Sequence, residues 1–103
     1  KLLLKSKVNI KGPFPADTIF NVAVKGKYDV VVAMYHDQGL IPVKLTAPNT
    51  AVNWTVGIPV IRTSPDHGTA FDIAHTSDAN PSSLEHAVQL ATELAQTKRL
   101  HPC

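Results

Sequence analysis

One short apolar segment constrains the fold more than any other feature of this chain of 103 residues. Residues 28–34 read YDVVVAM, with three consecutive valines at the centre. Strands that are buried on both faces, as in parallel sheets, are near-continuous apolar runs of this kind. The polar string YHDQG follows at 35–39 and predicts a loop at the end of the strand. We therefore predict an α/β fold whose strand-end loops carry the polar residues, because ligands bind at such loops in open α/β sheets.

Shorter signals predict the remaining elements. Residues 8–10 alternate like a short strand, and residues 51–62 hold two further strand candidates. A short helix is expected between the GPFP break at 12–15 and Gly26. Residues 46–50 are expected to form a turn-rich loop, and one or two helical turns are expected between residues 69 and 74.

The clearest element is an amphipathic helix expected from Asn80-Pro81 to about Lys98. Proline suits the first helical turn, and Ser82 with Glu85 has the spacing of a capping box. Apolar residues at helical spacing are expected to line one face of this helix: Leu84, Ala87, Val88, Ala91 and Leu94.

Composition excludes several classes of protein. The chain is 44% hydrophobic and 17% charged, which is too apolar for a disordered segment. Ten basic and eight acidic residues are interspersed along the chain, with no basic stripe for nucleic acid. The longest apolar run, 30–35, is far short of the roughly 18 residues that span a bilayer. We expect neither nucleic acid nor membrane as a partner, and the single cysteine, Cys103, fits a reduced, cytoplasmic setting.

Four polar residues are candidates for chemistry. His36 directly follows the predicted strand, where an imidazole can serve as a metal ligand, as a general acid or base, or as a hydrogen-bonded loop residue. One histidine cannot hold a metal alone, because stable sites need three or four donors. The other three, which combine an ammonium, an amide and a guanidinium, suit a phosphate or carboxylate: Lys44, Asn53 and Arg62. Taken singly, each of these three is better explained as the solvated flank of an apolar segment.

Arg62 follows the apolar run 56–61, so its guanidinium is expected at the carboxyl end of a strand. The glycine motifs that usually bind nucleotide phosphates, G-x-G-x-x-G and the P-loop, do not occur in the sequence. A nucleotide cofactor would therefore need a different kind of loop.

Three strings in order resemble the 4-hydroxythreonine-4-phosphate dehydrogenase family: GPFPADT at 12–18, YHDQG at 35–39 and IRTSPDHGTAFDIA at 61–74. The resemblance implies a three-layer α/β/α fold similar to that of the isocitrate and isopropylmalate dehydrogenases. Residues 1–103 would form a single α/β unit, the C-terminal part of a longer two-domain enzyme. The active site would be completed across a homodimer.

The resemblance also implies residue roles. His36 matches one histidine ligand of a divalent metal, which would be zinc, magnesium or cobalt. Lys44, Asn53 and Arg62 match contacts to the phosphorylated substrate. The cofactor, NAD or NADP, would be contacted by a loop of four residues: His67, Gly68, Thr69 and Ala70. The chain departs from the family at 75–77, where it has HTS instead of the usual glycine and basic residue.

The implied activity is the NAD-dependent oxidation of 4-hydroxythreonine-4-phosphate, with decarboxylation to 3-amino-2-oxopropyl phosphate, in vitamin B6 biosynthesis. The family's other metal histidines precede the first residue of this chain, so the isolated fragment is expected to be inactive. Two alternatives stay open. One is a related dehydrogenase of a phosphorylated sugar acid such as 4-phosphothreonate, and the other is a non-catalytic fragment that only folds or dimerises.

Overall fold

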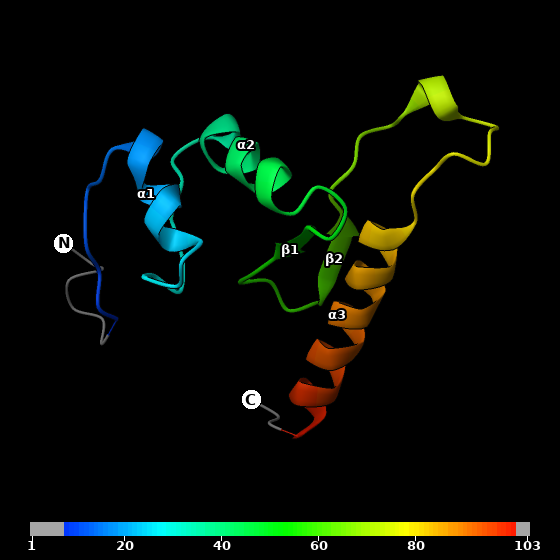
Figure 1. Cartoon of the computed structure of the whole chain (residues 1–103). Helices are drawn as coiled ribbons and strands as arrows, with labels where there is room; N and C mark the ends of the chain where they lie inside the picture. The colour runs from blue at the N-terminus through cyan, green and yellow to red at the C-terminus, as the bar shows by residue number, and fades with distance from the viewer. Residues whose placement is uncertain (1–7, 101–103) are drawn as a thin grey trace. The chain divides into compact units, whose positions relative to one another are not determined.

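The computed structural model describes residues 8–100 and divides the chain into two compact units, Lys1–Pro42 and Val43–Cys103. The elements follow in this order (Figure 1): α1 (Ala16–Ala23), α2 (His36–Thr46), β1 (Val52–Thr55), β2 (Arg62–Pro65), the 3-10 turn η2 (Phe71–Ile73) and α3 (Ser82–Leu100). The α/β class is confirmed at this coarse level. The three-layer arrangement and the single α/β unit stay predictions.

Helix α1 in the first unit confirms the predicted short helix. Pro15 has an extended backbone, with φ −61° and ψ 133°, and its carbonyl accepts hydrogen bonds from the N–H groups of Thr18 (3.3 Å) and Ile19 (3.2 Å). The helix ends at Ala23. Gly26 then has φ +78°, a left-handed conformation that glycine reaches without a steric penalty, so the helix stops where the sequence predicts.

Residues 28–34 do not form the predicted buried strand. The segment pairs with no strand among the described residues, and Val30, Val32 and Met34 are 78%, 76% and 77% exposed. A strand needs a neighbour for its backbone N–H and C=O groups, and residues 8–100 offer this segment none. The N–H of Met34 donates instead to Gln38 Oε1, at 2.8 Å. The strand predicted at 8–10 is also wrong, because these residues have no regular structure.

Residues 36–39 of the polar string form the first turn of helix α2, in place of the predicted loop. A Cβ at Gly39 would lie 3.2 Å from Ala33 Cβ, so the missing side chain lets the helix lie close to the segment that precedes it. Pro42 lies inside the helix, where its missing N–H removes one helical hydrogen bond. The turn-rich loop predicted at 46–50 is confirmed after the end of α2.

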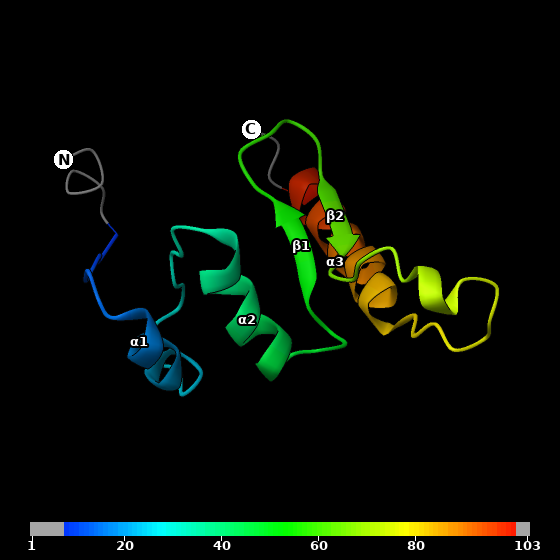
Figure 2. The ribbon, with the colours of Figure 1, turned by 90° about the horizontal axis from the view of Figure 1, so that it is seen from above.

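The second unit contains an antiparallel hairpin packed beside α3 (Figure 2). Strand β1 confirms the first of the two candidates within 51–62. The second prediction is wrong in position, because β2 begins only at Arg62. Residues 56–61 connect the strands and are exposed, with φ +88° at Gly57. Arg62 therefore begins a strand and does not end one.

Helix α3 confirms the predicted amphipathic helix, but its first turn is capped differently. Asn80 Oδ1 accepts a hydrogen bond from the N–H of Ser82, at 2.9 Å. The N–H of Glu85 donates to the carbonyl of Pro81, at 3.0 Å, and not to the hydroxyl of Ser82. Asn80 thus caps the helix, and the predicted capping box is wrong.

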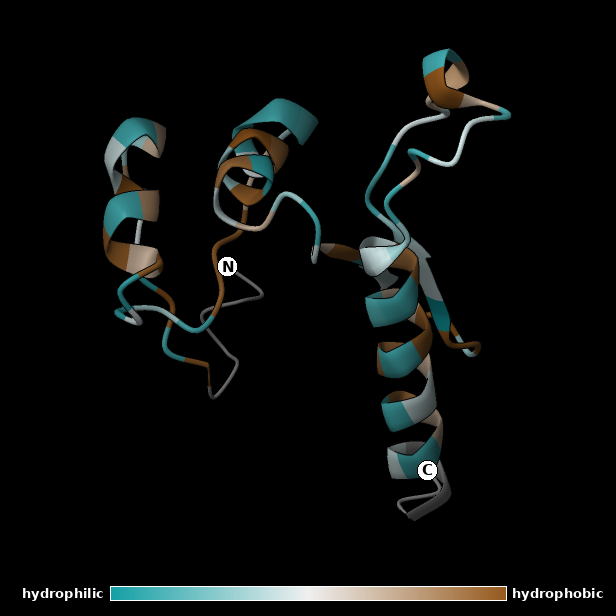
Figure 3. Ribbon diagram, turned by 45° about the vertical axis from the view of Figure 1, so that its right-hand side comes forward, coloured by the Kyte–Doolittle hydropathy of each residue, from teal (hydrophilic) through white to brown (hydrophobic). Residues whose placement is uncertain are grey.

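The buried face of α3 is narrow. Ala87 is 2% exposed and Ser83 is 8% exposed, whereas Leu84 and Val88, predicted for the buried face, are exposed. Figure 3 shows apolar bands in brown along a helix that is otherwise largely hydrophilic. No helix within residues 8–100 has both the length and the apolar character needed to cross a membrane.

Candidate functional site

Two of the predicted substrate residues, Asn53 and Arg62, share one face of the hairpin. Thr55 pairs with Arg62, and Asn53 lies two residues before Thr55 on the same strand. Because successive side chains of a strand alternate between faces, these three residues lie on one face. Arg62 Nη1 donates to Thr55 Oγ1 at 2.9 Å, which orients the guanidinium across the two strands.

The opposite face of the hairpin is the one that α3 covers. Thr63 follows Arg62 and therefore points to the other side of β2. Its hydroxyl donates to the carbonyl of Ala87 on α3, at 2.8 Å. The face with Asn53 and Arg62 is thus turned away from α3, and both residues are exposed.

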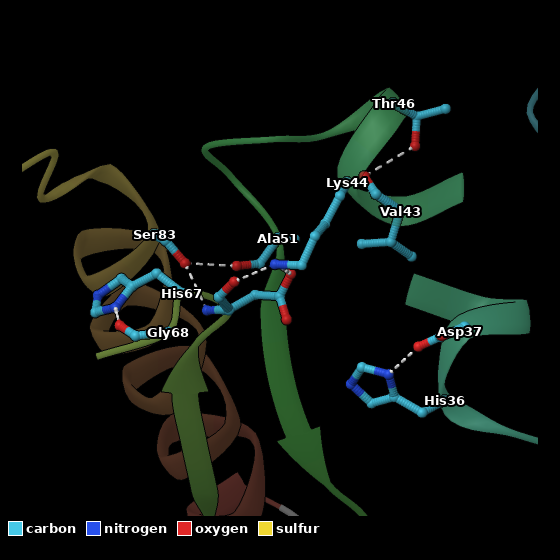
Figure 4. A network of polar contacts seen from close by, with 10 residues as sticks. His36, Asp37, Val43, Lys44, Thr46, Ala51, His67, Gly68 and Ser83 are labelled. Carbon is cyan, nitrogen blue, oxygen red and sulfur yellow. Dashed lines mark hydrogen bonds and ion pairs between the residues drawn. The ribbon is translucent and has the colours of Figure 1, made fainter. Parts of the chain in front are cut away.

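The third predicted substrate residue, Lys44, lies in the last turn of α2 and is bound by Asp66. Its Nζ donates to the main-chain oxygen of Asp66 at 2.8 Å and to Oδ2 at 3.1 Å. The N–H of Asp66 donates to Ser83 Oγ at 2.9 Å, and the Ser83 hydroxyl donates to the carbonyl of Ala51 at 2.7 Å (Figure 4). These bonds connect the end of α2, the hairpin and the first turn of α3.

The four predicted cofactor residues lie together on the wall of one hollow of about 480 Å³: His67, Gly68, Thr69 and Ala70. Ile73 of η2 and several residues between η2 and α3 line the same hollow. The loop begins directly after Asp66, and Asp66 and Ser83 also line the hollow. The four loop residues therefore lie next to Asp66, whose oxygens accept the hydrogen bonds of Lys44.

A left-handed backbone marks the end of this loop. Ala70 has φ 47° and ψ 48°, a conformation that costs a residue with a side chain about 1–2 kcal/mol. It turns the chain into η2, which is a single 3-10 turn where the sequence predicts one or two helical turns. His75, five residues further along, also has a positive φ, of 69°.

His36 opens α2 in the first unit. Its Nδ1 lies 2.7 Å from Asp37 Oδ1, and both side chains are exposed (Figure 4). A carboxylate on one ring nitrogen fixes the imidazole and leaves Nε2 for a ligand. Within the described part of the chain, no group of three or more His, Cys, Asp or Glu residues could hold a metal ion. His36 as one ligand of a metal site therefore stays a prediction.

The sequence did not predict three residues that hold the candidate side chains in position: Asp66, Ser83 and Thr55. Asp66 lies within the string 61–74 with no role of its own, and Ser83 lies within the predicted helix with no role beyond it. Thr55 carries no motif. Lys44 and Asp66 are 22 residues apart, so no spacing rule brings them together. Only the pairing register of the hairpin, which places Thr55 opposite Arg62, identifies Thr55.

Known proteins are similar to this chain over most of its length, including the residues described above. The family model described as "Pyridoxal phosphate biosynthetic protein PdxA" matches residues 1–91. The chain belongs to this family. The resemblance seen in the sequence is thereby confirmed.

Several relatives are highly similar. The 4-hydroxythreonine-4-phosphate dehydrogenase of Bradyrhizobium diazoefficiens is 55% identical over 98 residues, which are 95% of this chain and 28% of that protein. The D-threonate 4-phosphate dehydrogenase of Pectobacterium atrosepticum is 55% identical over 93 residues, which are 89% of this chain and 28% of that protein. The chain thus spans between a quarter and a third of the length of these relatives.

A solved structure is similar as well. The crystal structure of a 4-hydroxythreonine-4-phosphate dehydrogenase from Burkholderia phymatum matches with a TM-score of 0.64 and 50% sequence identity. The match covers 90% of this chain and 28% of that chain. The similarity therefore extends over most of this chain and a smaller part of the solved protein.

Proposed function

We propose that this chain supplies substrate and cofactor contacts to a full-length dehydrogenase of 4-hydroxythreonine-4-phosphate. The reaction is oxidation by NAD, or NADP, with loss of carbon dioxide to give 3-amino-2-oxopropyl phosphate in vitamin B6 biosynthesis. The observation that carries this proposal is the shared face of Asn53 and Arg62, which is turned away from α3. A relative with 55% identity bears the name of this activity.

The three substrate residues have complementary roles toward a phosphate. The Arg62 guanidinium can donate two parallel hydrogen bonds to phosphate oxygens, and it is already oriented by Thr55. Asn53 offers an amide N–H on the same face, and Lys44 offers a compact positive charge. Together they would fix the phosphorylated end of the substrate, so that the reacting carbon stays in one position.

His36 and the loop 67–70 are proposed to serve the cofactors. The chemistry that these groups would supply when bound is uptake of a hydride by the nicotinamide and polarisation of the substrate hydroxyl by a divalent ion, which would be zinc, magnesium or cobalt. His36 would be one ligand of the ion, with its ring held by Asp37. The ion needs further donors beyond the described residues, because a single imidazole does not hold a metal.

The larger assembly is part of the same proposal. We infer a three-layer α/β/α fold for the full-length protein, a homodimer with a shared active site, and a cytoplasmic location. The many exposed apolar side chains of residues 8–100 support a larger assembly, since Val30, Val32 and Met34 gain burial only from other parts of a protein.

A second candidate is oxidation of D-threonate 4-phosphate. The specific observation in its favour is the relative of that name, which is as similar to this chain as the first. Both printed names include a 4-phosphate, so the three phosphate contacts serve either substrate. Residues that distinguish an amino group from a hydroxyl would decide between the two.

Turnover by the purified full-length protein tests the proposal. We expect reduction of NAD or NADP with 4-hydroxythreonine-4-phosphate at a higher kcat/KM than with D-threonate 4-phosphate. The reverse order would establish the second candidate, and no turnover of either substrate would contradict both.

A matched pair of variants tests the hairpin face. Asn53→Ala should raise KM for the phosphorylated substrate. Gln89→Ala, which removes an exposed amide from α3, should leave KM unchanged. Equal KM values for the two variants would remove Asn53 from the site.

A further inference from the structure

We propose that Asp66 is a positioning residue that holds the Lys44 ammonium ready for the phosphorylated substrate. The inference rests on the proposed function, because it takes Lys44 as a substrate contact. Asp66 itself acts through Lys44 and needs no contact with the substrate.

The ammonium of Lys44 is only partly used by Asp66. An ammonium has three N–H donors, and Asp66 accepts two hydrogen bonds, at the main-chain oxygen (2.8 Å) and at Oδ2 (3.1 Å). One donor is left for an anion. The Lys44 side chain is 52% exposed, whereas the Asp66 side chain is 17% exposed, so the ammonium is accessible from solvent and its anchor is largely covered.

Asp66 is in turn held by the buried side chain of Ser83. Its N–H donates to Ser83 Oγ, and the Ser83 hydroxyl donates to the carbonyl of Ala51, which precedes β1. Ser83 is 8% exposed. A free lysine side chain loses much rotamer entropy when it binds a ligand. Because Asp66 is held by the hairpin and α3, part of this entropy is lost on folding and not on substrate binding.

The Asp66 carboxylate also has an opposite effect, because its negative charge weakens the attraction of Lys44 for a phosphate. The two effects predict opposite changes in KM when the charge is removed. If positioning dominates, Asp66→Asn raises KM for the phosphorylated substrate. If charge compensation dominates, the same variant lowers KM. We expect KM to rise, since Asp66 is held by Ser83 of α3, and Ser83 is held by the carbonyl of Ala51 beside the hairpin.

A double-mutant cycle in the full-length enzyme tests the proposal with 4-hydroxythreonine-4-phosphate, or D-threonate 4-phosphate if that is the better substrate. Asp66→Asn should raise KM about threefold to tenfold and leave kcat nearly unchanged, as expected when a uniform binding contact is weakened. In the Lys44→Ala background, Asp66→Asn should have no further effect on KM. Glu85→Gln, which removes an exposed carboxylate near Ser83, serves as the control and should not change KM.

Three results would overturn the proposal. The first is an unchanged or lower KM for Asp66→Asn while Lys44→Ala raises KM. The second is an equal increase in KM on Asp66→Asn in both backgrounds, which indicates a structural effect. The third is an unchanged KM for Lys44→Ala, which rejects Lys44 as a substrate contact in the proposed function itself.

A second variant covers the case in which Asp66→Asn does not fold. Ser83→Ala removes the acceptor of the Asp66 N–H and leaves the carboxylate in place. It should raise KM in the same direction, by about twofold, and only when Lys44 is present. An unchanged KM for Ser83→Ala in a folded enzyme that still needs Lys44 would contradict the positioning role.

Discussion

Replacing Arg62 with lysine in the full-length enzyme tests the candidate phosphate contact most directly. The substitution keeps the positive charge at the first residue of β2 and removes the planar fork of donors. The structure shows that one arm of this fork, Nη1, donates to Thr55 Oγ1 at 2.9 Å. The remaining donors face away from α3, on the face that also carries Asn53.

The expected loss follows from the donors that lysine cannot replace. A hydrogen bond to a charged group contributes about 1.5–3 kcal/mol, and an ammonium cannot make two parallel bonds in the plane of a phosphate. The variant also loses the orientation that Thr55 gives to the guanidinium. We therefore expect kcat/KM to fall about tenfold to a hundredfold, which corresponds to about 1.4–2.7 kcal/mol of transition-state binding.

The assay is steady-state kinetics with the phosphorylated substrate, together with cofactor affinity and Tm. The last two should change little, because Arg62 is exposed and no buried volume is lost. Thr55→Val should produce a smaller loss of kcat/KM by releasing the guanidinium. Its control is Thr92→Val, which removes an exposed hydroxyl that bonds to the carbonyl of Val88 on α3. Wild-type kcat/KM for Arg62→Lys would show that Arg62 is only a solvated residue at the start of β2.

Three further predictions concern other parts of the chain. His36→Ala in the full-length protein should abolish binding of the divalent metal, measured by elemental analysis, and nearly all turnover. The control is His86→Ala, which removes an exposed ring that contacts the carbonyl of Ser82 and should change neither. The chain of 103 residues alone should show no turnover with NAD, because its described residues contain no complete metal-binding group, and activity of the pure chain would refute this. His75→Gly should raise the stability by up to about 1 kcal/mol by removing a side chain from a left-handed conformation, whereas the β-branched His75→Val should lower it, as measured by thermal unfolding of the full-length protein.

The elements that the sequence predicted correctly are those with local signals. Helix α1 lies between a proline-rich break and Gly26, and α3 begins where Asn80 and Pro81 mark a helix start. Each signal depends on backbone geometry within a few residues, so it acts in any tertiary context. The strand predicted at 28–34 was wrong because its formation depends on contacts outside the segment. An apolar run becomes a strand only when neighbouring strands accept its hydrogen bonds, and the described residues offer none.

The candidate site was predictable by residue type and not by arrangement. Asn53 and Arg62 were identified as polar flanks of apolar segments, but only the hairpin register places them on one face. Arg62 was expected at the end of a strand and lies at the start of one, because the apolar residues before it form a connection. The contact of Lys44 with Asp66 depends on tertiary packing, for which the sequence carries no local signal.

Asp66 connects the two groups of residues that we propose for substrate and cofactor. Its carbonyl and carboxylate bind Lys44, its N–H is bound by Ser83, and the loop 67–70 begins at the next residue. Both backbone polar groups of Asp66 are therefore fixed before the loop starts. The other end of the loop is set by the left-handed backbone of Ala70. Because the proposed substrate contact and the proposed cofactor loop share this one anchor in α3, loss of the Ser83 hydroxyl should disturb both, whereas loss of the Lys44 ammonium should disturb substrate binding alone.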